Sequence, residues 1–452
     1  MKKIIFIVCL TTLVLAQSKN ATITLYRDGY GLVKQPISFN LVKGRTTVLF
    51  TSLPEKLESD SPFLSLGAKA DVLYQRYNYD LFNTREFLKA HLGEEIEVTL
   101  TSGKSYDGRL LDIDGNIITI SRKREVKLFN YDQVVELKIP GVSPKENLTP
   151  QLTWEIKSER AGRVSGDLIY LSRGFDWRTG YRLIISPDEN SGTLITEAVV
   201  DNNTNLDFEN VRLQLVEGQL KRVHRRQPPR PVRMVAPQAK LMAEDVEPTP
   251  SFIQEEVADY KIYTLSEPLR FPSRESITAS LYSDKEIKIS RLYKFENKER
   301  STRDEPLTVQ ISFVNNDGNN LGLPLPGGTI QMYYTRSDGA VEFTGEDYLK
   351  QVPKGEEAKI IAGKAFDVIG KRTVVNYDRK RKSEEATIKL ELKNKRKDEI
   401  SVQLVEHIYG DWVIKKPTHD YIKKDAQTIQ FDLKIAPESV EVVSYTYRKE
   451  WK

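Results

Sequence analysis

The sequence predicts a mainly β protein built from several folded bodies. Apolar and polar residues alternate over many short stretches, which is the pattern of strands with one buried face. Turn-forming residues such as Gly, Asn, Asp and Pro separate these stretches. Long amphipathic segments of helical period are almost absent, and 452 residues exceed the size of one ordinary domain. We therefore expect β-sandwiches together with a small β-barrel.

The first sixteen residues have the pattern of a secretory leader. Lys2 and Lys3 provide its basic start, and an apolar run over residues 4–15 ends at Ala16, a small residue suited to cleavage. A run of about twelve apolar residues is too short to span roughly 30 Å of hydrocarbon. We expect residues 1–16 to be a signal peptide cleaved near Ala16, and the mature protein to be secreted or periplasmic.

The expected mature chain has no cysteine, because the single Cys9 lies in the apolar run of the leader. This excludes disulfides, thiol catalysis and cysteine-bound metals. No later segment has the length of a transmembrane helix, so we expect no transmembrane span in the mature chain. Lys and Arg number 68 against 64 Asp and Glu, so overall charge indicates neither nucleic acid nor anionic lipid as a partner.

Residues 21–82 predict an amino-terminal β domain. Ile23 and Leu25 alternate with polar neighbours, and further along the chain Val48 and Phe50 do the same. Glycine-containing turn signals lie between the two pairs.

Residues 83–140 show the clearest local architecture. Asn83 is a suitable cap for a short helix, and five short strands follow, with a hairpin signal at Asp114-Gly115. One helix followed by five strands resembles the Sm-like small barrel, which is SH3-like in form. Such barrels often bind single-stranded nucleic acid. Export would remove this protein from most cellular RNA, so we expect a spacer or protein-docking module, with nucleic-acid binding as an alternative.

The remaining sequence predicts β-sandwich structure on both sides of an irregular segment. Residues 150–220 alternate like strands and predict the first part of a central sandwich, and residues 259–452 predict the rest as one or two units. Residues 221–258 are rich in proline and charge, so we expect a disordered linker or long loop. The basic part, residues 221–233, leaves two alternatives, solvation or contact with anionic lipid or polysaccharide.

Several short motifs in the second half resemble one known family. They are Trp177 with Tyr181, residues 202–211, Leu323-Pro324-Leu325-Pro326-Gly327-Gly328, Gly345-Glu346-Asp347, Pro353-Lys354-Gly355-Glu356 and Gly363-Lys364-Ala365-Phe366-Asp367-Val368. Together they resemble the bacterial domain-of-unknown-function family numbered 4139, some members of which are labelled mucoidy-inhibitor-like. The resemblance covers roughly residues 150–452.

This resemblance implies an exported, β-rich protein and brings no catalytic residues with it. The chain lacks the long coiled-coil insertion of the mucoidy-associated members and has the small barrel in that place. A role in capsule or mucoid control therefore does not transfer to this chain.

Residues able to carry chemistry are few and scattered, so we assign no catalytic, cofactor-binding or metal-binding residue and expect no cofactor. The histidines His91, His224, His407 and His419 have no metal-ligand spacing, whereas zinc needs three or four convergent ligands. The sequence has neither a serine-hydrolase elbow nor a phosphate-binding loop. The glycines of residues 323–328 are typical of turns, since no helix follows them to bind a phosphate.

Two carboxylate pairs and one basic run have ordinary structural explanations. Asp112 with Asp114, or Glu346 with Asp347, could in principle act as acid and base in a glycosidase. With 64 acidic residues such pairs are frequent by chance, and we expect turn and surface positions. Residues 122–124, Arg-Lys-Arg, fall in a predicted hairpin loop.

The sequence thus ranks three functions. The first is an exported, non-catalytic, envelope-associated interaction or scaffold protein whose partner is an envelope protein or polysaccharide. The second is a hydrolase of envelope polysaccharide, which needs a cleft with two acids about 5 to 9.5 Å apart. The third is a nucleic-acid-binding small barrel, which needs a continuous basic face lined by aromatic residues.

Overall fold

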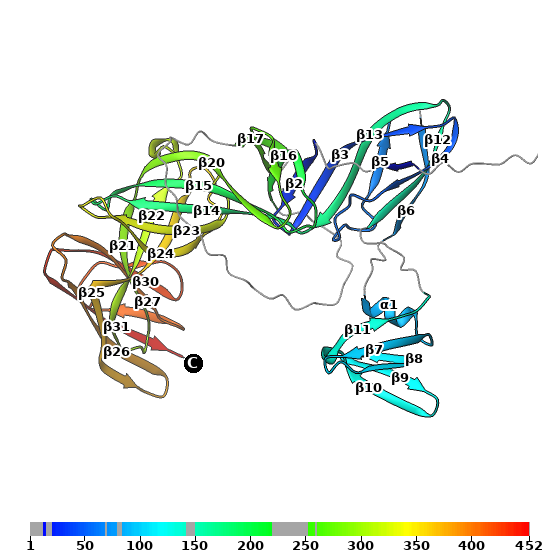
Figure 1. Ribbon diagram of the computed structural model, residues 1–452. Coiled ribbons are helices and arrows are strands. Elements are labelled where there is room, and N and C mark those ends of the chain that lie inside the picture. The colour runs from blue at the N-terminus through cyan, green and yellow to red at the C-terminus, as the bar shows by residue number, and fades with distance from the viewer. Residues whose placement is uncertain are drawn as a thin grey trace, which may run out of the picture. The chain divides into compact units, whose positions relative to one another are not determined.

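The computed structural model describes residues 12–14, 20–67, 70–78, 84–141, 150–218, 252–257 and 260–451. The protein is mainly β, as the sequence predicts (Figure 1). Contacts divide the chain into a first unit, residues 1–176, 201–214 and 268–275, and a second unit, residues 177–200, 215–267 and 276–452. Among the described residues, no helix has the length and hydrophobicity that crossing a bilayer requires.

Apart from residues 84–141, the first unit contains two sheets that share an aromatic core. One sheet has the order β2-β3-β13-β5, with β16 beside β2 and β19 beside β16, and the other has the order β1-β4-β12-β6. Trp154 of β12 is fully buried, 6.1 Å from Phe50 of its own sheet and 5.9 Å from Phe39 of the opposite one, measured between ring centroids. The strands are β1 (Thr12–Val14), β2 (Thr22–Tyr26), β3 (Tyr30–Leu41), β4 (Gly44–Phe50), β5 (Phe63–Leu66), β6 (Ala70–Asn78), β12 (Gln151–Ser158), β13 (Gly162–Arg173), β16 (Phe208–Glu217) and β19 (Leu269–Phe271).

Strands β12 and β13 complete the amino-terminal body, although the sequence assigned them to the central sandwich. β13 pairs antiparallel with β3 over its whole length, and β12 pairs antiparallel with both β4 and β6. The boundary between the units therefore falls near residue 176 instead of 150. Local alternation identifies strands but contains no information on which distant strand each one pairs with.

Strand β1 falls inside the expected leader. Its three residues pair in parallel with residues 48–50 of β4. The rest of residues 1–19, including the expected cleavage position at Ala16, lies outside the described residues. Removal of the leader would remove β1 and leave that edge of β4 without a neighbour.

Residues 84–141 form a small body of one helix and five strands (Figure 1). It has a hydrophobic core of its own. Its five strands are antiparallel and have the order β10-β9-β8-β7-β11. Leu88 of the helix packs with strand residues such as Ile96 and Phe129. The elements lie where the sequence predicts them: α1 (Thr84–Ala90), β7 (Glu95–Leu100), β8 (Ser105–Asp114), β9 (Ile117–Arg122), β10 (Glu125–Asn130) and β11 (Val134–Lys138), with a 3-10 turn at Tyr131–Gln133.

The second unit contains two sheets and one hairpin. The first sheet has the order β20-β15-β14-β23-β24, and the second has the order β28-β31-β26-β25-β22-β21-β27-β30-β29. The strands are β14 (Phe175–Ile185), β15 (Ser191–Asn202), β17 (Phe252–Val257), β18 (Tyr260–Leu265), β20 (Glu275–Lys288), β21 (Ser290–Lys298), β22 (Arg303–Val314), β23 (Gly328–Thr335), β24 (Val341–Leu349), β25 (Glu357–Arg379), β26 (Ser383–Asn394), β27 (Ile400–His407), β28 (Trp412–Lys415), β29 (Ile422–Lys423), β30 (Thr428–Ile435) and β31 (Val440–Glu450), with a 3-10 turn at Asp317–Asn319.

The nine-stranded sheet curls over a core made by its own strands. β30 and β31 are far apart in the hydrogen-bonded order, yet Phe431 of β30 lies 5.9 Å from Tyr445 of β31 between ring centroids. Leu390 of β26, Leu404 of β27 and Val443 of β31 are fully buried in the same cluster. The sheet therefore buries one face without needing a second sheet or a helix layer.

The proline-rich segment at residues 323–328 is a strand-pairing feature. The hydroxyl of Tyr181 donates to the carbonyl oxygen of Pro326 at 2.7 Å. A Cβ at Gly328 would lie 2.2 Å from the carbonyl oxygen of Thr179, so glycine allows β23 to approach β14 in parallel pairing. The sequence predicted turn chemistry here, but Leu325 forms an antiparallel bridge with Val352 and Gly328 begins β23, so the glycine serves a close strand approach.

Part of the segment expected to lack regular structure forms a strand. Phe252–Val257 is β17, which pairs antiparallel with Tyr260–Leu265 of β18. Phe252 is buried. Burial of its side chain stabilises the strand, although the surrounding composition does not favour one. The rest of the segment from 221 to 258, including the basic residues 221–233, lies outside the described residues.

Candidate functional site

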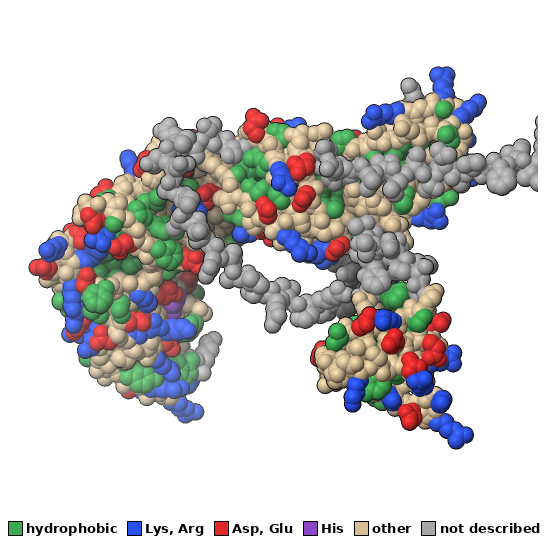
Figure 2. Space-filling view, in the orientation of Figure 1, with side chains coloured by type: hydrophobic (Ala, Val, Ile, Leu, Met, Phe, Trp, Pro, Cys, Tyr) green, Lys and Arg blue, Asp and Glu red, His purple; other side chains and the backbone are tan. Residues whose placement is uncertain are grey.

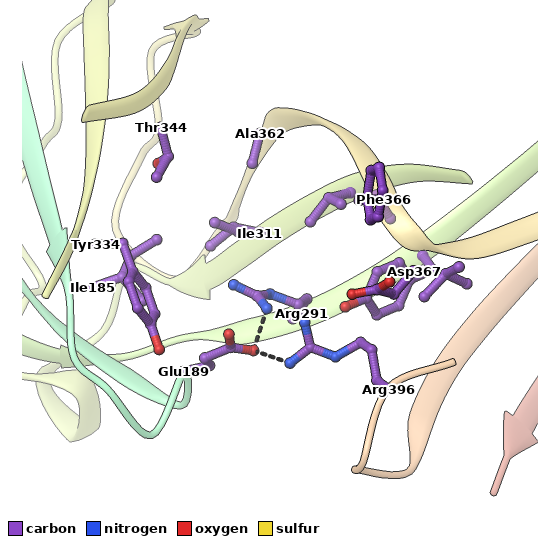
Figure 3. A pocket seen from close by; sticks show the side chains of 14 residues that line it. Ile185, Glu189, Arg291, Ile311, Tyr334, Thr344, Ala362, Phe366, Asp367 and Arg396 are labelled. Atoms are coloured by element: carbon purple, nitrogen blue, oxygen red, sulfur yellow. Dashed lines mark hydrogen bonds and ion pairs between the residues drawn. The ribbon is translucent and has the colours of Figure 1, made fainter. Parts of the chain in front are cut away.

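A pocket of about 310 Å³ lies in the second unit, and we call it the β25 pocket (Figure 3). Strands β14, β21, β22, β23, β24 and β25 contribute to its walls, together with the turn after β14 and the segment after β26. The lining residues are Ile185, Glu189, Arg291, Tyr293, Val309, Ile311, Tyr334, Thr344, Ala362, Ala365, Phe366, Asp367, Val368 and Arg396. One part of the wall is apolar, and charged groups gather at the other.

A bulge in β25 shapes one side of the pocket. The pairing of β25 with β22 is interrupted between Lys364 and Ile369, and only Leu307 of β22 lies opposite the four residues between them. Gly363, just before the bulge, has φ of 111°, a backbone conformation that favours glycine. Bulges of this kind bend a strand and redirect its side chains.

The bulge presents an aromatic ring and a carboxylate to solvent. Phe366 is 91% exposed, more than any other large hydrophobic residue in the described ranges. Asp367 next to it is also exposed, and its carboxylate has no hydrogen-bond or ion-pair partner among the described residues. Figure 3 shows both side chains at the pocket. These two groups are available to a ligand or partner.

The charged end of the pocket is an internally neutralised cluster. Oε2 of Glu189 accepts hydrogen bonds from Nη1 of Arg291 and from Nη2 of Arg396, the latter at 2.8 Å (dashed lines in Figure 3). Nε of Arg396 also donates to Oδ1 of Asp398 at 3.0 Å. Two guanidinium groups therefore share one carboxylate, and Glu189 is held in structural ion pairs.

The turn that carries Glu189 is fixed by its neighbours. Glu189 has φ of 60°, in the left-handed region that is uncommon for residues other than glycine. The amide of Asn190 donates to Oδ1 of Asp188 at 3.2 Å, and the hydroxyl of Tyr334 donates to the carbonyl oxygen of Pro187 at 3.3 Å. The surrounding contacts thus determine a strained conformation, which is a feature often found at ligand sites.

The buried part of the pocket contains a phenol and an unsatisfied donor. Burial raises the pKa of Tyr293, and the positive charges of Arg396 and Arg291 only partly oppose this effect. Tyr293 is therefore a neutral phenol at physiological pH. Nε of Arg291 is buried without a hydrogen-bond partner. The pocket offers an apolar wall, hydrogen-bond donors and one unpaired carboxylate at its mouth, which suits recognition of another molecule.

The described histidines lie apart and are already engaged. Nε2 of His407 lies 2.8 Å from Oε1 of Glu296, and Nε2 of His419 lies 3.1 Å from Oε1 of Glu441. His91 contacts a backbone carbonyl within α1, and His224 is outside the described residues. Within the described parts of the chain, no group of three or more potential ligands could hold a metal ion.

The carboxylate pairs noted in the sequence serve the backbone. Oδ2 of Asp347 accepts from the amide of Ile361 at 2.7 Å, which links β24 to β25 beside the pocket. Oδ1 of Asp112 accepts from the amide of Ile113 at 2.8 Å, within the strand before the Asp114-Gly115 hairpin. The sequence predicted turn and surface positions, whereas both pairs lie within strands, β8 and β24.

The small body at residues 84–141 has mixed charges. Acidic residues are as frequent there as basic ones, and Figure 2 shows both kinds interspersed on the visible face. Arg122 of the basic run at 122–124 pairs with Asp107, and Lys123 has the positive φ of a turn. A continuous basic face, which nucleic-acid binding would need, is not formed by these residues.

Sequence reasoning missed the β25 pocket itself. Arg291, Glu189 and Arg396 come from distant parts of the chain, so no local pattern connects them. Phe366 and Asp367 were within a noted family motif, but the motif gave no indication that a bulge would expose them. The one sequence feature that could have indicated the site is Phe366 next to Asp367, shortly after Gly363.

Comparison with known protein families gives a match over much of the chain. The family model described as a domain of unknown function, DUF4139, matches residues 167–452, which is more than half of the chain. The matched range includes the whole lining of the β25 pocket. A search of curated proteins found no match.

Proposed function

The chain belongs to the DUF4139 family, whose model describes a domain of unknown function, and we propose that it is an exported, non-catalytic, envelope-associated interaction protein. In this proposal the β25 pocket docks an envelope protein. The leader pattern at residues 1–16 supports export. The chemistry of the pocket supports binding over catalysis.

The observation that carries the proposal is the exposure of Phe366. Burying a phenylalanine side chain is worth about 1.5–3 kcal/mol. Phe366 does not make this contribution, because the bulge leaves it 91% exposed to water. Large aromatic residues that lie exposed beside a pocket are typical anchors of protein interfaces.

The neighbouring groups define the chemistry of the partner. Asp367 is an unpaired carboxylate next to the exposed ring, and the pocket wall behind it includes Val309, Ile311 and Ala362. A complementary segment has an apolar side chain to fill the pocket and a Lys or Arg side chain to pair with Asp367. We propose a partner protein with such a segment exposed in the cell envelope.

A hydrolytic role has less support from the same residues. General acid and base catalysis by carboxylates requires two groups whose protonation differs at working pH. Of the two carboxylates that line the pocket, Glu189 is bound by two guanidinium groups, and only Asp367 is unpaired. The arrangement therefore favours recognition.

Crosslinking in the native envelope tests the proposal. The full-length protein and its Phe366→Ser variant are crosslinked in intact cells, and the captured species are identified. We expect the wild type to capture an envelope protein and the variant to lose most of this capture, because the aromatic anchor is gone.

Phe63→Ser is the matched control, since Phe63 is a phenylalanine of the first unit that is 53% exposed. Its capture should equal that of the wild type. Equal loss in both variants, or capture of no envelope protein by the wild type together with turnover of a glycan panel, would overturn the proposal.

A further inference from the structure

A second pocket, of about 270 Å³, lies among strand ends and loops of the nine-stranded sheet. Glu384 at the start of β26 lines it, so we call it the Glu384 pocket. The rim of the pocket consists of Arg379 at the end of β25, Tyr409 and Asp411 in the loop after β27, and Trp451 after β31. All of these residues belong to the second unit.

The pocket has a rigid, charged floor. The side chain of Glu384 is only 2% exposed and accepts hydrogen bonds from Nη2 of Arg300 at 2.8 Å, from the hydroxyl of Tyr447 at 3.0 Å and from the hydroxyl of Tyr377 at 3.1 Å. Burial disfavours the charged carboxylate, but these donors outweigh it and hold the pKa of Glu384 below its ordinary value. The floor is therefore a fixed, ionised acceptor.

A second ion pair and a buried arginine support this floor. Lys449 pairs with Oε2 of Glu299, which also accepts from the amide of Tyr409 at 3.0 Å. Arg372, fully buried, donates to the carbonyl oxygen of Glu299 at 3.0 Å and to that of Ser301. The loop between β21 and β22 is thus held in place beside the pocket.

The rim, in contrast, contains groups without partners. Arg379 has no ion pair among the described residues, and its guanidinium lies 5.8 Å from the ring centroid of Trp451. The carboxylate of Asp411 and the hydroxyl of Tyr409 likewise have no partner among the described residues. The rim therefore offers a planar donor, a carboxyl acceptor, a hydroxyl and two aromatic rings.

We propose that the Glu384 pocket binds one or two rings of an uncharged saccharide. Sugar hydroxyls both donate and accept, so one ring can take hydrogen bonds from Arg379 and give one to Asp411. The apolar face of a sugar ring can lie against Trp451 or Tyr409. The volume is slightly below the range of about 300–1,000 Å³ typical of drug-sized ligands, which suits so small a group.

The charge of the pocket lining favours an uncharged sugar over anionic ligands. Arg300, Arg379 and Lys449 are matched by Glu384, Asp411 and Glu450, so the lining has no net charge. A phosphate or sulfated glycan would meet Asp411 with no excess of positive charge to offset it. A metal ion is not favoured either, since no described cluster of three ligands exists.

The same geometry argues against Glu384 as the acid of a glycosidase. A glycosidase acid must be protonated near neutral pH. Glu384 has the opposite property, because Tyr447, Tyr377 and Arg300 keep it ionised. The sugar is expected to leave the pocket unchanged. This inference is independent of docking at the β25 pocket, because the two pockets consist of different residues. Its test uses purified protein, whereas the docking test uses intact cells.

Calorimetry of the purified full-length chain against a panel of neutral oligosaccharides tests the inference. We expect binding by at least one neutral oligosaccharide. Asp411→Asn and Arg379→Gln should each weaken that binding about tenfold, the effect of one hydrogen bond to a charged group. No oligosaccharide should be cleaved during the measurement.

Asp420→Asn is the matched control for Asp411→Asn, because Asp420 is an exposed aspartate of the same unit outside the pocket. It should bind as the wild type does. Circular dichroism checks that the variants are folded. Tyr409→Phe removes only a rim hydroxyl and should weaken binding less than Asp411→Asn does. Absence of binding to every neutral oligosaccharide, a preference for anionic ligands, or equal affinity in Asp411→Asn and wild type would overturn the inference.

Discussion

The small body at residues 84–141 and the nine-stranded sheet use charge in opposite ways. In the small body, ion pairs such as Arg122 with Asp107 are on the surface, with side chains 61% and 56% exposed. In the nine-stranded sheet, Arg372 and Glu406 form an ion pair whose side chains are both fully buried. The first body is held together by apolar contacts between neighbouring strands, whereas the second also depends on a charged group in its core.

The buried pair is well satisfied. Nη2 and Nε of Arg372 donate to Oε2 of Glu406 at 2.8 and 2.9 Å, and the hydroxyl of Tyr445 donates to the same oxygen. Arg372 also holds the loop at Glu299. A buried ion pair often adds little net stability, but it fixes one arrangement of the strands that carry it.

The largest expected effect comes from breaking this pair. Arg372→Met would leave the carboxylate of Glu406 buried without its cation, and we expect a loss of about 3–5 kcal/mol in the free energy of unfolding. The matched Arg122→Met in the small body should lose about 0–1 kcal/mol, because its pair is exposed. Urea denaturation followed by fluorescence measures both. Similar losses in the two variants would contradict the contrast between the two regions.

A glycine substitution tests how tightly the curled sheet is packed. A Cβ at Gly370 would lie 2.8 Å from ring atoms of Phe295, so Gly370→Ala should cost about 1–3 kcal/mol through overpacking. Gly180 of β14 has nothing within 4 Å of the position that a Cβ would occupy, and Gly180→Ala should change stability by less than about 0.5 kcal/mol. The same denaturation experiment distinguishes them, and a neutral Gly370→Ala would show that the core is loose.

The Glu384 carboxylate predicts a pH dependence of stability. Its folded pKa is lowered, so it stabilises the native state above its ordinary value of 4.5, and this contribution is lost as pH falls through the folded pKa. Glu384→Gln should lose about 1.5–3 kcal/mol at pH 7, the range for hydrogen bonds to a charged group. Denaturation at pH 7 and pH 3 should show this difference shrinking in acid. A stability difference between wild type and Glu384→Gln that grows as the pH falls would contradict a lowered folded pKa of Glu384.

The smallest expected effect on stability is at Phe366. Because the residue is 91% exposed, Phe366→Ser should change the free energy of unfolding by less than about 0.5 kcal/mol. Thermal denaturation compared with the wild type measures the change. A large loss of stability would mean that Phe366 is a structural residue, and the docking proposal would lose its main support.

The two regions also differ in how far the sequence predicts them. In the small body, most paired strands follow one another along the chain, so alternation and hairpin signals such as Asp114-Gly115 predict the helix and all five strands. In the larger bodies, β12 and β13 were recognised as strands, but their partners in the amino-terminal unit were not. The strand β17 was missed because proline and charge dominate its surroundings.

The candidate site was less predictable than the fold. Glu189, Arg291 and Arg396 meet only after β14, β21 and β26 have been assembled, so their sequence spacing reveals nothing. The exposure of Phe366 depends on a bulge, and a bulge follows from the register between two strands. Register is set by tertiary packing, which local composition does not record.

Site-specific photocrosslinking tests the central claim most directly. A photoreactive residue is placed at position 366 of the full-length protein in intact cells, and in a parallel experiment at position 63. The proposed docking function predicts a discrete adduct with an envelope protein from position 366 and none of the same mass from position 63. Absence of any adduct from position 366, or identical adducts from both positions, would contradict it.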